Sequence, residues 1–258
     1  MIRMNLSKNM LNNEEINKEL PSICVPLIGK NLHEIKDEIE FIKSKKPDMI
    51  EWRADFFTDL NQEKKVNEVL AAIKQGIPET PVLLTIRSEK EGGQKISLSE
   101  DEKLLLFEKV SVNKKIDILD YELVNGEKNI GEVREITKQS GIQLMLSYHN
   151  FERTPDQEVL MTKCKVAESF KADLVKISVM SQSKDDVLLV LNVTNEASKT
   201  IKIPLVTISM GESGAITRLL GWAFGSTITY AIGAKSSAPG QMPIETLRSA
   251  INTMKKSL

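Results

Sequence analysis

The sequence predicts an α/β fold in which eight parallel strands close into a barrel, and two observations indicate it. Short runs rich in apolar and β-branched residues recur roughly every 25 to 35 residues, about the length of one βα unit, and there are eight of them. A stretch with helical periodicity follows each run. Eight strands alternating with eight helices is the count for a (β/α)8 TIM barrel. An open doubly wound sheet is the alternative, but it needs no eightfold repeat and usually has a Gly-rich turn after its first strand, where this chain reads PLIGKN.

The expected strands are dominated by Val, Ile, Leu and aromatic residues, as ICVPLI and PVLLTIR illustrate. In chain order they cover residues 23–28, 48–54, 81–87, 116–123, 142–149, 173–178, 203–209 and 227–233. The expected helices repeat apolar residues at helical spacing, as in LHEIKDEIEFIK. They cover residues 32–45, 64–75, 100–112, 131–140, 156–170, 184–199, 215–224 and 243–256.

We expect one domain over residues 1–258, because no linker or low-complexity tract interrupts the alternation. Roughly the first 20 residues precede the first strand, and we expect them to form an extension at the barrel floor. They lack the apolar run and small-residue cleavage site of a signal peptide. The longest uncharged stretch, 219–234, is interrupted by glycines and hydroxyl residues, so it does not predict a membrane span.

Composition predicts a small-molecule partner in the cytoplasm. Lys and Arg number 35 against 36 Asp and Glu, and the net charge of −1 gives no basic field for nucleic acid or an anionic membrane. The two cysteines, Cys24 and Cys164, lie in apolar stretches without metal-ligand spacing. We therefore expect neither a disulfide framework nor a metal site, and a reducing compartment.

Ionisable side chains lie at the carboxyl ends of five of the expected strands, where barrels of this kind carry their chemistry. They are Glu51, Arg53, Arg87, Asp120, Glu122, His149 and Lys176. Met210 and Arg218 follow the seventh strand, and KSSAPGQ (235–241) follows the eighth. Each of these residues alone could meet solvent or form an ion pair, and a lone histidine is commonly structural. Their convergence at one end of a closed barrel predicts a functional site.

Lys176 is the most informative of these residues, because apolar residues surround it in ADLVKISVM. Strand alternation places Lys176 on one face with Leu174 and Ser178, and in a barrel that face points inward. A structural interpretation has the ammonium group reach the barrel mouth or pair with a buried glutamate. The chemical interpretation is an amine nucleophile that forms an imine with a ketone or aldehyde.

The chemical interpretation requires a neutral amine. Making a lysine neutral near pH 7 means lowering its pKa by roughly 3 units from about 10.4, a differential of about 4 kcal/mol. Burial together with repulsion from Arg53, Arg87 and Arg218 would favour that change. His149, on the neighbouring strand, could move protons beside the imine, and no metal or other cofactor is then required.

Six segments, in order along the chain, closely resemble the type I 3-dehydroquinate dehydratase family. They are EWRADFF, TIRSEKEGG, SYHNF, VKISVM, SMGESGAITRLLGWAFGS and SAPGQ. The resemblance covers nearly all of the chain except its start. It implies a metal-free dehydration of 3-dehydroquinate to 3-dehydroshikimate in the shikimate pathway, and a homodimer, since family members are commonly dimeric.

The resemblance also implies roles for particular residues. Lys176 would form the imine with the C3 ketone, His149 would move protons, and Glu91 would orient or tune His149. Arg218 would bind the C1 carboxylate, and the segments EGGQ and SSAPGQ would be mobile loops that close over substrate. The implied substrate-binding residues are Glu51, Arg53, Arg87, Met210, Arg218, Tyr230, Ser237, Ala238 and Gln241.

Three positions depart from the family pattern, and two other functions stay open. Tyr230 stands where some relatives have phenylalanine, Ile208 where some have methionine and Pro26 where some have serine, and we expect all three at the periphery of the site. A class I aldolase acting on a sugar phosphate would use the same barrel and lysine, with GESGAI as a phosphate site. A barrel retained only for ligand binding is the second alternative.

Overall fold

The structure is a computed structural model, and it describes residues 20–256. Its strands are β1 (Ser22–Leu27), β2 (Met49–Arg53), β3 (Val82–Thr85), β4 (Ile118–Glu122), β5 (Gln143–Asn150), β6 (Leu174–Met180), β7 (Leu205–Met210) and β8 (Ile228–Tyr230). Its α-helices are α2 (Leu32–Lys43), α3 (Glu63–Gly76), α4 (Glu100–Ser111), α5 (Glu127–Ser140), α6 (Gln157–Ser169), α7 (Lys184–Thr200), α8 (Ile216–Leu220) and α9 (Ile244–Lys255).

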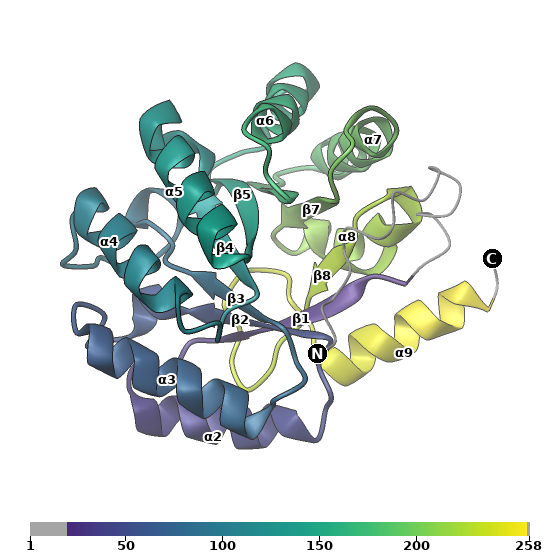
Figure 1. Cartoon of the computed structure of the whole chain (residues 1–258). Helices are drawn as coiled ribbons and strands as arrows, with labels where there is room; N and C mark the ends of the chain where they lie inside the picture. The colour runs from purple at the N-terminus through teal and green to yellow at the C-terminus, as the bar shows by residue number, and fades with distance from the viewer. Residues whose placement is uncertain (1–19, 257–258) are drawn as a thin grey trace.

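The eight strands form a barrel surrounded by the helices, which confirms the predicted fold class (Figure 1). All pairings are parallel, and the hydrogen-bonded order is β7-β6-β5-β4-β3-β2-β1-β8. A parallel bridge between Leu205 and Ser226 joins β7 to the segment before β8. There the Thr227 N–H donates to the Leu205 carbonyl oxygen at 2.8 Å, so the barrel is nearly closed.

The predicted element boundaries need three corrections. The eighth strand ends at Tyr230 instead of residue 233. The fourth helix, α5, begins at Glu127, four residues before the predicted start. The seventh helix is split, because α8 ends at Leu220 and a 3₁₀ turn over Gly221–Phe224 leads to Gly225 at φ 113, in the left-handed region that favours glycine. The extension expected over roughly the first 20 residues lies almost wholly outside the described part of the chain.

Local sequence signals fix several helix starts. The Asn31 side chain accepts from the Glu34 N–H at the start of α2. Ser99 and Glu102 form a reciprocal capping box on α4, and Ser183 and Asp186 do the same on α7. These caps satisfy backbone donors that a helix start leaves unpaired, so the three helices begin directly after the capping residues.

The barrel interior is layered, because every second residue of each strand points inward. The apolar layer is Cys24, Met49, Leu83, Ile118, Met145, Leu174, Val206 and Ile228. Two residues further along each strand comes a middle layer that includes Glu51, Thr85, Asp120, Ser147, Lys176 and Tyr230. Another two residues along comes an upper layer that includes Arg53, Arg87, Glu122, His149, Ser178 and Met210. The polar residues are thus confined to the carboxyl half of the barrel.

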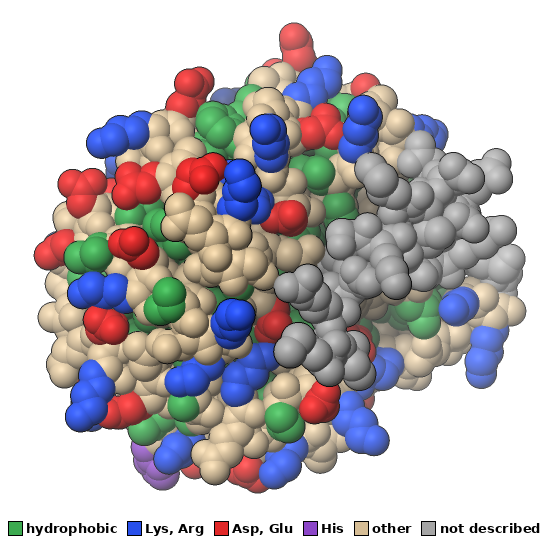
Figure 2. Space-filling model, in the orientation of Figure 1, with side chains coloured by type: hydrophobic (Ala, Val, Ile, Leu, Met, Phe, Trp, Pro, Cys, Tyr) green, Lys and Arg blue, Asp and Glu red, His purple; other side chains and the backbone are tan. Residues whose placement is uncertain are grey.

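The outer surface carries mixed charge. On the face in view, Lys and Arg are interspersed with Asp and Glu (Figure 2). Cys24 and Cys164 are buried free thiols. None of the helices in residues 20–256 is both long and apolar enough to cross a membrane.

Candidate active site

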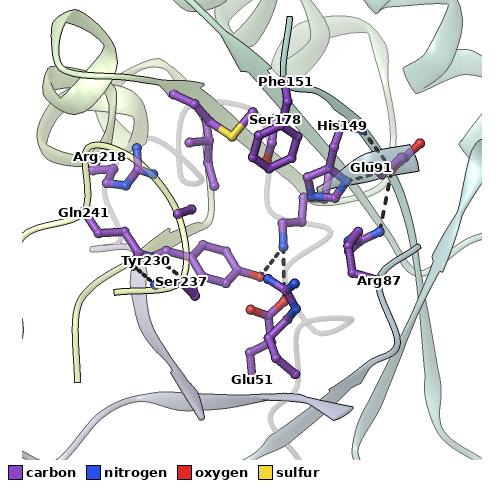
Figure 3. Close-up of a pocket in the computed structure, with 15 residues that line it drawn as sticks. Glu51, Arg87, Glu91, His149, Phe151, Ser178, Arg218, Tyr230, Ser237 and Gln241 are labelled. Atoms are coloured by element: carbon purple, nitrogen blue, oxygen red, sulfur yellow. Dashed lines mark hydrogen bonds and ion pairs between the residues drawn. The ribbon is translucent and has the colours of Figure 1, made fainter. Parts of the chain in front are cut away.

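Asp120 and Glu122, which the sequence also placed at the carboxyl ends of the strands, are buried outside the lining of the pocket found there. The twelve site residues that the family resemblance implied all line this pocket (Figure 3). They are Glu51, Arg53, Arg87, Glu91, His149, Lys176, Met210, Arg218, Tyr230, Ser237, Ala238 and Gln241. Phe151, Ser178 and Ile208 complete the lining. Residues from five strands, from helix α8 and from the segments that follow β3, β5 and β8 therefore face one space, as the barrel prediction required.

Lys176 points inward from β6 and is only 5% exposed. Its Nζ donates to the Tyr230 hydroxyl at 2.9 Å and to Glu51 Oε1 at 3.3 Å, and Asp120 Oδ2 lies 4.0 Å away. The Tyr230 hydroxyl therefore contacts the amine, and the expectation that Tyr230 lies at the periphery of the site is wrong.

Two of the three arginines expected to repel the Lys176 amine have carboxylate partners of their own. Arg53 binds Asp55 through two hydrogen bonds of 2.8 and 2.9 Å. Arg87 lies 2.7 Å from Asp120 and 3.2 Å from Glu122. The structure corrects the sequence expectation, because these carboxylates offset much of the positive charge that the arginines bring.

His149 forms a pair with Glu91. The His149 Nδ1 and the Glu91 Oε2 are 2.8 Å apart, and the same oxygen accepts the His149 backbone N–H at 3.0 Å. Glu91 ends a 3₁₀ turn over Glu89–Glu91 that follows β3, so a residue 58 positions away in the chain fixes the imidazole. The Nδ1 contact leaves Nε2 available for a second partner.

Burial shifts the pKa of each partner in the direction that favours its neutral form. Burial lowers the pKa of His149 well below its ordinary value, and the positive charges of Arg87, Lys176 and Arg53 lower it further. Burial raises the pKa of Glu91 to about 8, although Arg87 opposes the shift. The imidazole is therefore uncharged near pH 7 and can accept a proton.

The double glycine after Glu91 is a steric requirement. Gly92 has φ 80, in the left-handed region, and a Cβ there would meet the Phe151 ring at 2.3 Å. A Cβ at Gly93 would lie 2.0 Å from the Arg87 carbonyl oxygen. Only glycine at both positions lets this turn fold back onto β3 and aim Glu91 at His149.

Arg218 differs from the other two arginines of the pocket, because its buried guanidinium binds no carboxylate in the described chain. It is 2% exposed and donates to the backbone carbonyls of Ser209 at 3.3 Å and Pro239 at 2.9 Å. Its Nε has no hydrogen-bond partner among residues 20–256. Burial lowers its pKa to about 10, so it stays charged at neutral pH. An unpaired buried cation facing a pocket is suited to bind an anionic group.

The Pro239 contact ties Arg218 to the loop between β8 and α9. In that loop Gln241 Nε2 donates to the Ser237 hydroxyl at 3.1 Å, and Gln241 Oε1 accepts the Ser237 N–H at 2.9 Å. A Cβ at Gly240 would lie 2.4 Å from the Gly211 carbonyl oxygen, so this loop packs closely on the one after β7.

The model of the family described as type I 3-dehydroquinase matches residues 23–257. The chain belongs to the type I 3-dehydroquinase family. That membership does not favour the class I aldolase alternative.

Curated relatives and solved structures agree with the family match. A 3-dehydroquinate dehydratase of a Geobacillus species (strain WCH70) is 44% identical over 99% of each chain. One from Albidiferax ferrireducens is 45% identical over 93% of this chain and 91% of its own. The crystal structure of the Geobacillus kaustophilus 3-dehydroquinate dehydratase superposes with a TM-score of 0.90 at 42% identity, covering 92% of both chains. A type I 3-dehydroquinate dehydratase structure from Clostridium difficile, with covalently modified comenic acid, gives 0.88 at 38% identity, covering 92% of this chain and 93% of its own.

Sequence reasoning about this type I 3-dehydroquinase missed two pocket residues, Ser178 and Phe151. Ser178 could have been found, because it shares the inward face of β6 with Lys176, and its buried hydroxyl has no partner within the described residues. Ile208 was expected only at the periphery, but it lines the pocket, whereas Pro26 does not. Phe151 lies just after β5 in a loop, where strand alternation gives no direction.

Gly93→Ala should destabilise the turn that carries Glu91. Because the new methyl would clash with the Arg87 carbonyl oxygen, we expect the free energy of unfolding in urea to fall by about 1–3 kcal/mol. Gly131→Ala within α5 is the matched control, since its Cβ meets nothing within 4 Å. That control should gain up to about 1 kcal/mol from helix propensity. Equal stability of the two variants would contradict the steric argument.

Proposed function

We propose that this chain removes water from 3-dehydroquinate to give 3-dehydroshikimate in the shikimate pathway, through an imine on Lys176. One observation carries the proposal. In a chain of this family, a buried lysine, a hydrogen-bonded His149–Glu91 pair and an Arg218 without a carboxylate partner in the described chain line the same pocket. These groups match the ketone, the acidic C–H and the carboxylate of the proposed substrate.

Arg218 would orient the substrate through its C1 carboxylate. A planar guanidinium can give a carboxylate two parallel hydrogen bonds, and the unpartnered Nε is available for one of them. Ser237, Gln241 and the Ala238 backbone border the same part of the pocket and would support the carboxylate. Glu51, Arg53 and Arg87 would hold ring hydroxyls, with Met210 beside the ring.

Lys176 would attack the C3 ketone and expel its oxygen as water. The resulting protonated imine draws electrons from the ring, so the C–H bond at C2 becomes acidic. His149 would take the C2 proton at Nε2 while Glu91 holds Nδ1, and would then give a proton to the departing C1 hydroxyl. A C1=C2 double bond forms, and hydrolysis of the imine returns the amine and the C3 ketone. The net change is the loss of one water.

The family resemblance adds two further proposals. We expect a homodimer, which the mass measured by light scattering on the protein as it elutes from a size-exclusion column would test. We also expect the protein in the cytoplasm, which fractionation of the source cells would test.

The proposed function predicts turnover and a covalent label. Mixing the protein with 3-dehydroquinate should produce the ultraviolet absorbance of a conjugated enone. Borohydride added during turnover should reduce the imine, inactivate the protein and leave substrate-derived mass on the Lys176 peptide. Lys176→Arg should lose turnover, because a guanidinium cannot become a neutral nucleophile at accessible pH.

Several outcomes would contradict this function or mechanism. Label on exposed Lys235 alone, or inactivation with unmodified Lys176, would contradict the assigned nucleophile. Tight binding of 3-dehydroquinate without product would favour the binding-only alternative. Cleavage of phosphorylated ketoses with no action on cyclic acids would favour the aldolase.

The pH profile should report on the His149–Glu91 pair. The proton acceptor must be unprotonated, and burial holds the pKa of His149 well below its ordinary value. The kcat/KM should therefore rise with pH along an acid limb that lies below neutrality and belongs to the pair. Glu91→Gln should shift that acid limb, since the carboxyl whose pKa burial raises is gone. His149→Ala should fold, still trap some imine and turn over about 10²–10⁴-fold more slowly. An acid limb unmoved by Glu91→Gln would contradict the assignment.

Arg218→Lys should weaken substrate binding or turnover by roughly 2 kcal/mol or more, because a lysine cannot reproduce two hydrogen bonds to a carboxylate in a buried site. An analogue without the C1 carboxylate should distinguish the variant from the unchanged chain far less. Arg153→Lys, at an exposed arginine outside the pocket lining, is the matched control and should behave as wild type. Normal handling of 3-dehydroquinate by Arg218→Lys would refute the carboxylate role.

A further inference from the structure

The Tyr230 hydroxyl is in direct contact with the amine of Lys176. The two atoms are 2.9 Å apart, and Tyr230 is 3% exposed (Figure 3). The amine also lies 4.2 Å from the centroid of the Tyr230 ring, so the ring and the hydroxyl together hold it. Tyr230 is on β8 and Lys176 on β6, and the barrel wall supports both residues.

Imine formation poses a proton-transfer problem at this place. When a neutral amine attacks a ketone, the new C–N bond leaves a positive nitrogen and a negative oxygen on the same carbon. Direct transfer of the proton from nitrogen to oxygen would pass through a strained four-membered ring. A hydroxyl that accepts from the nitrogen and donates to the oxygen enlarges this ring to six members.

Tyr230 is the group that can do both. The other polar neighbours of Nζ within residues 20–256 are the carboxylates of Glu51 and Asp120. Asp120 only accepts while it is ionised, and the one proton that Glu51 takes from the ammonium is used in the later step, when the hydroxyl leaves. The hydroxyls of Thr85 and Ser147 are bound to Glu51 and Asp120 instead. Burial, and then the negative charge of Glu51, raise the pKa of Tyr230 well above its ordinary value, so its proton stays in place.

We propose that the Tyr230 hydroxyl relays a proton from Lys176 Nζ to the substrate carbonyl oxygen as the imine forms, and in the reverse direction as it hydrolyses. The proposal rests on the proposed imine at Lys176. Tyr230 would accept a proton from the nitrogen while its own proton goes to the oxygen, so it ends uncharged. The product is a carbinolamine, with one new C–N bond and one O–H bond.

The remaining proton is also accounted for. The ammonium of Lys176 first gives one proton to Glu51, whose Oε1 is 3.3 Å from Nζ. That proton then passes to the carbinolamine hydroxyl, the C–O bond breaks, and water leaves with both protons. The lysine ends as a protonated imine, and Glu51 is ionised again.

The test is Tyr230→Phe, which removes one hydroxyl and keeps the ring. With 3-dehydroquinate and borohydride in rapid-quench experiments, we expect the rate of label appearing on Lys176 to fall roughly 10-fold or more. This lies at or below the low end of the usual 10²–10⁴-fold for acid–base groups, because a water molecule can enter the vacated space. Tyr148→Phe is the matched control, since Tyr148 lies outside the pocket lining and its hydroxyl, within the described residues, hydrogen-bonds only to the Asn150 amide at 3.4 Å. It should label at the wild-type rate.

The outcomes separate the relay from the imine itself. If the wild-type chain is labelled at Lys176 and Tyr230→Phe is labelled equally fast, the relay is wrong and the imine stands. If the wild-type chain is not labelled at Lys176, both proposals fail. A second measurement needs no variant, because the relay moves two protons. Labelling of the wild-type chain should slow in D₂O, and an unchanged rate would overturn the relay even if Tyr230→Phe failed to fold.

Discussion

The site depends on the contacts of one guanidinium, that of Arg87. It is 3% exposed and lies 2.7 Å from Asp120, 3.2 Å from Glu122 and 3.7 Å from Glu91. Burying this many charges is costly unless they compensate one another, and removing one partner of such a cluster typically costs about 3–5 kcal/mol. Through these contacts Arg87 fixes two carboxylates of the site. Glu91 binds the imidazole of His149, and Asp120 lies 4.0 Å from the amine of Lys176.

Strand alternation explains how a charged site can sit inside a stable barrel. The inward residues near the strand starts are apolar, and the next two inward positions along the strands carry most of the charge. The apolar layer excludes water from below, which strengthens every electrostatic interaction above it. The residues that stabilise the barrel and the residues of the site therefore occupy different positions along the same strands, as is typical of barrels of this fold.

The arginines of the pocket divide by their partners. Arg53 and Arg87 bind carboxylates of the chain, and their positive charge is largely compensated. Arg218 binds only backbone carbonyls, so its charge is left for a ligand. One of these carbonyls is that of Pro239, so Arg218 is also bound to the loop that borders the pocket. Anion binding and loop position are thus linked through one side chain.

The sequence by itself determined the eightfold alternation, the inward direction of Lys176 and the collection of polar residues at one end of the strands. These follow from periods of two and of three to four residues, which are local properties of the chain. Only the tertiary structure decided which side chains touch. The family resemblance implied that Glu91 acts on His149, and the structure adds the contact between them. The contact of Lys176 with Tyr230, 54 positions away, was not expected, and it arises because barrel closure brings β6 and β8 to one pocket. Local periodicity carries no information on such contacts, so the peripheral place expected of Tyr230 was wrong, as was the full repulsion expected from Arg53 and Arg87, whose charges are offset by carboxylates.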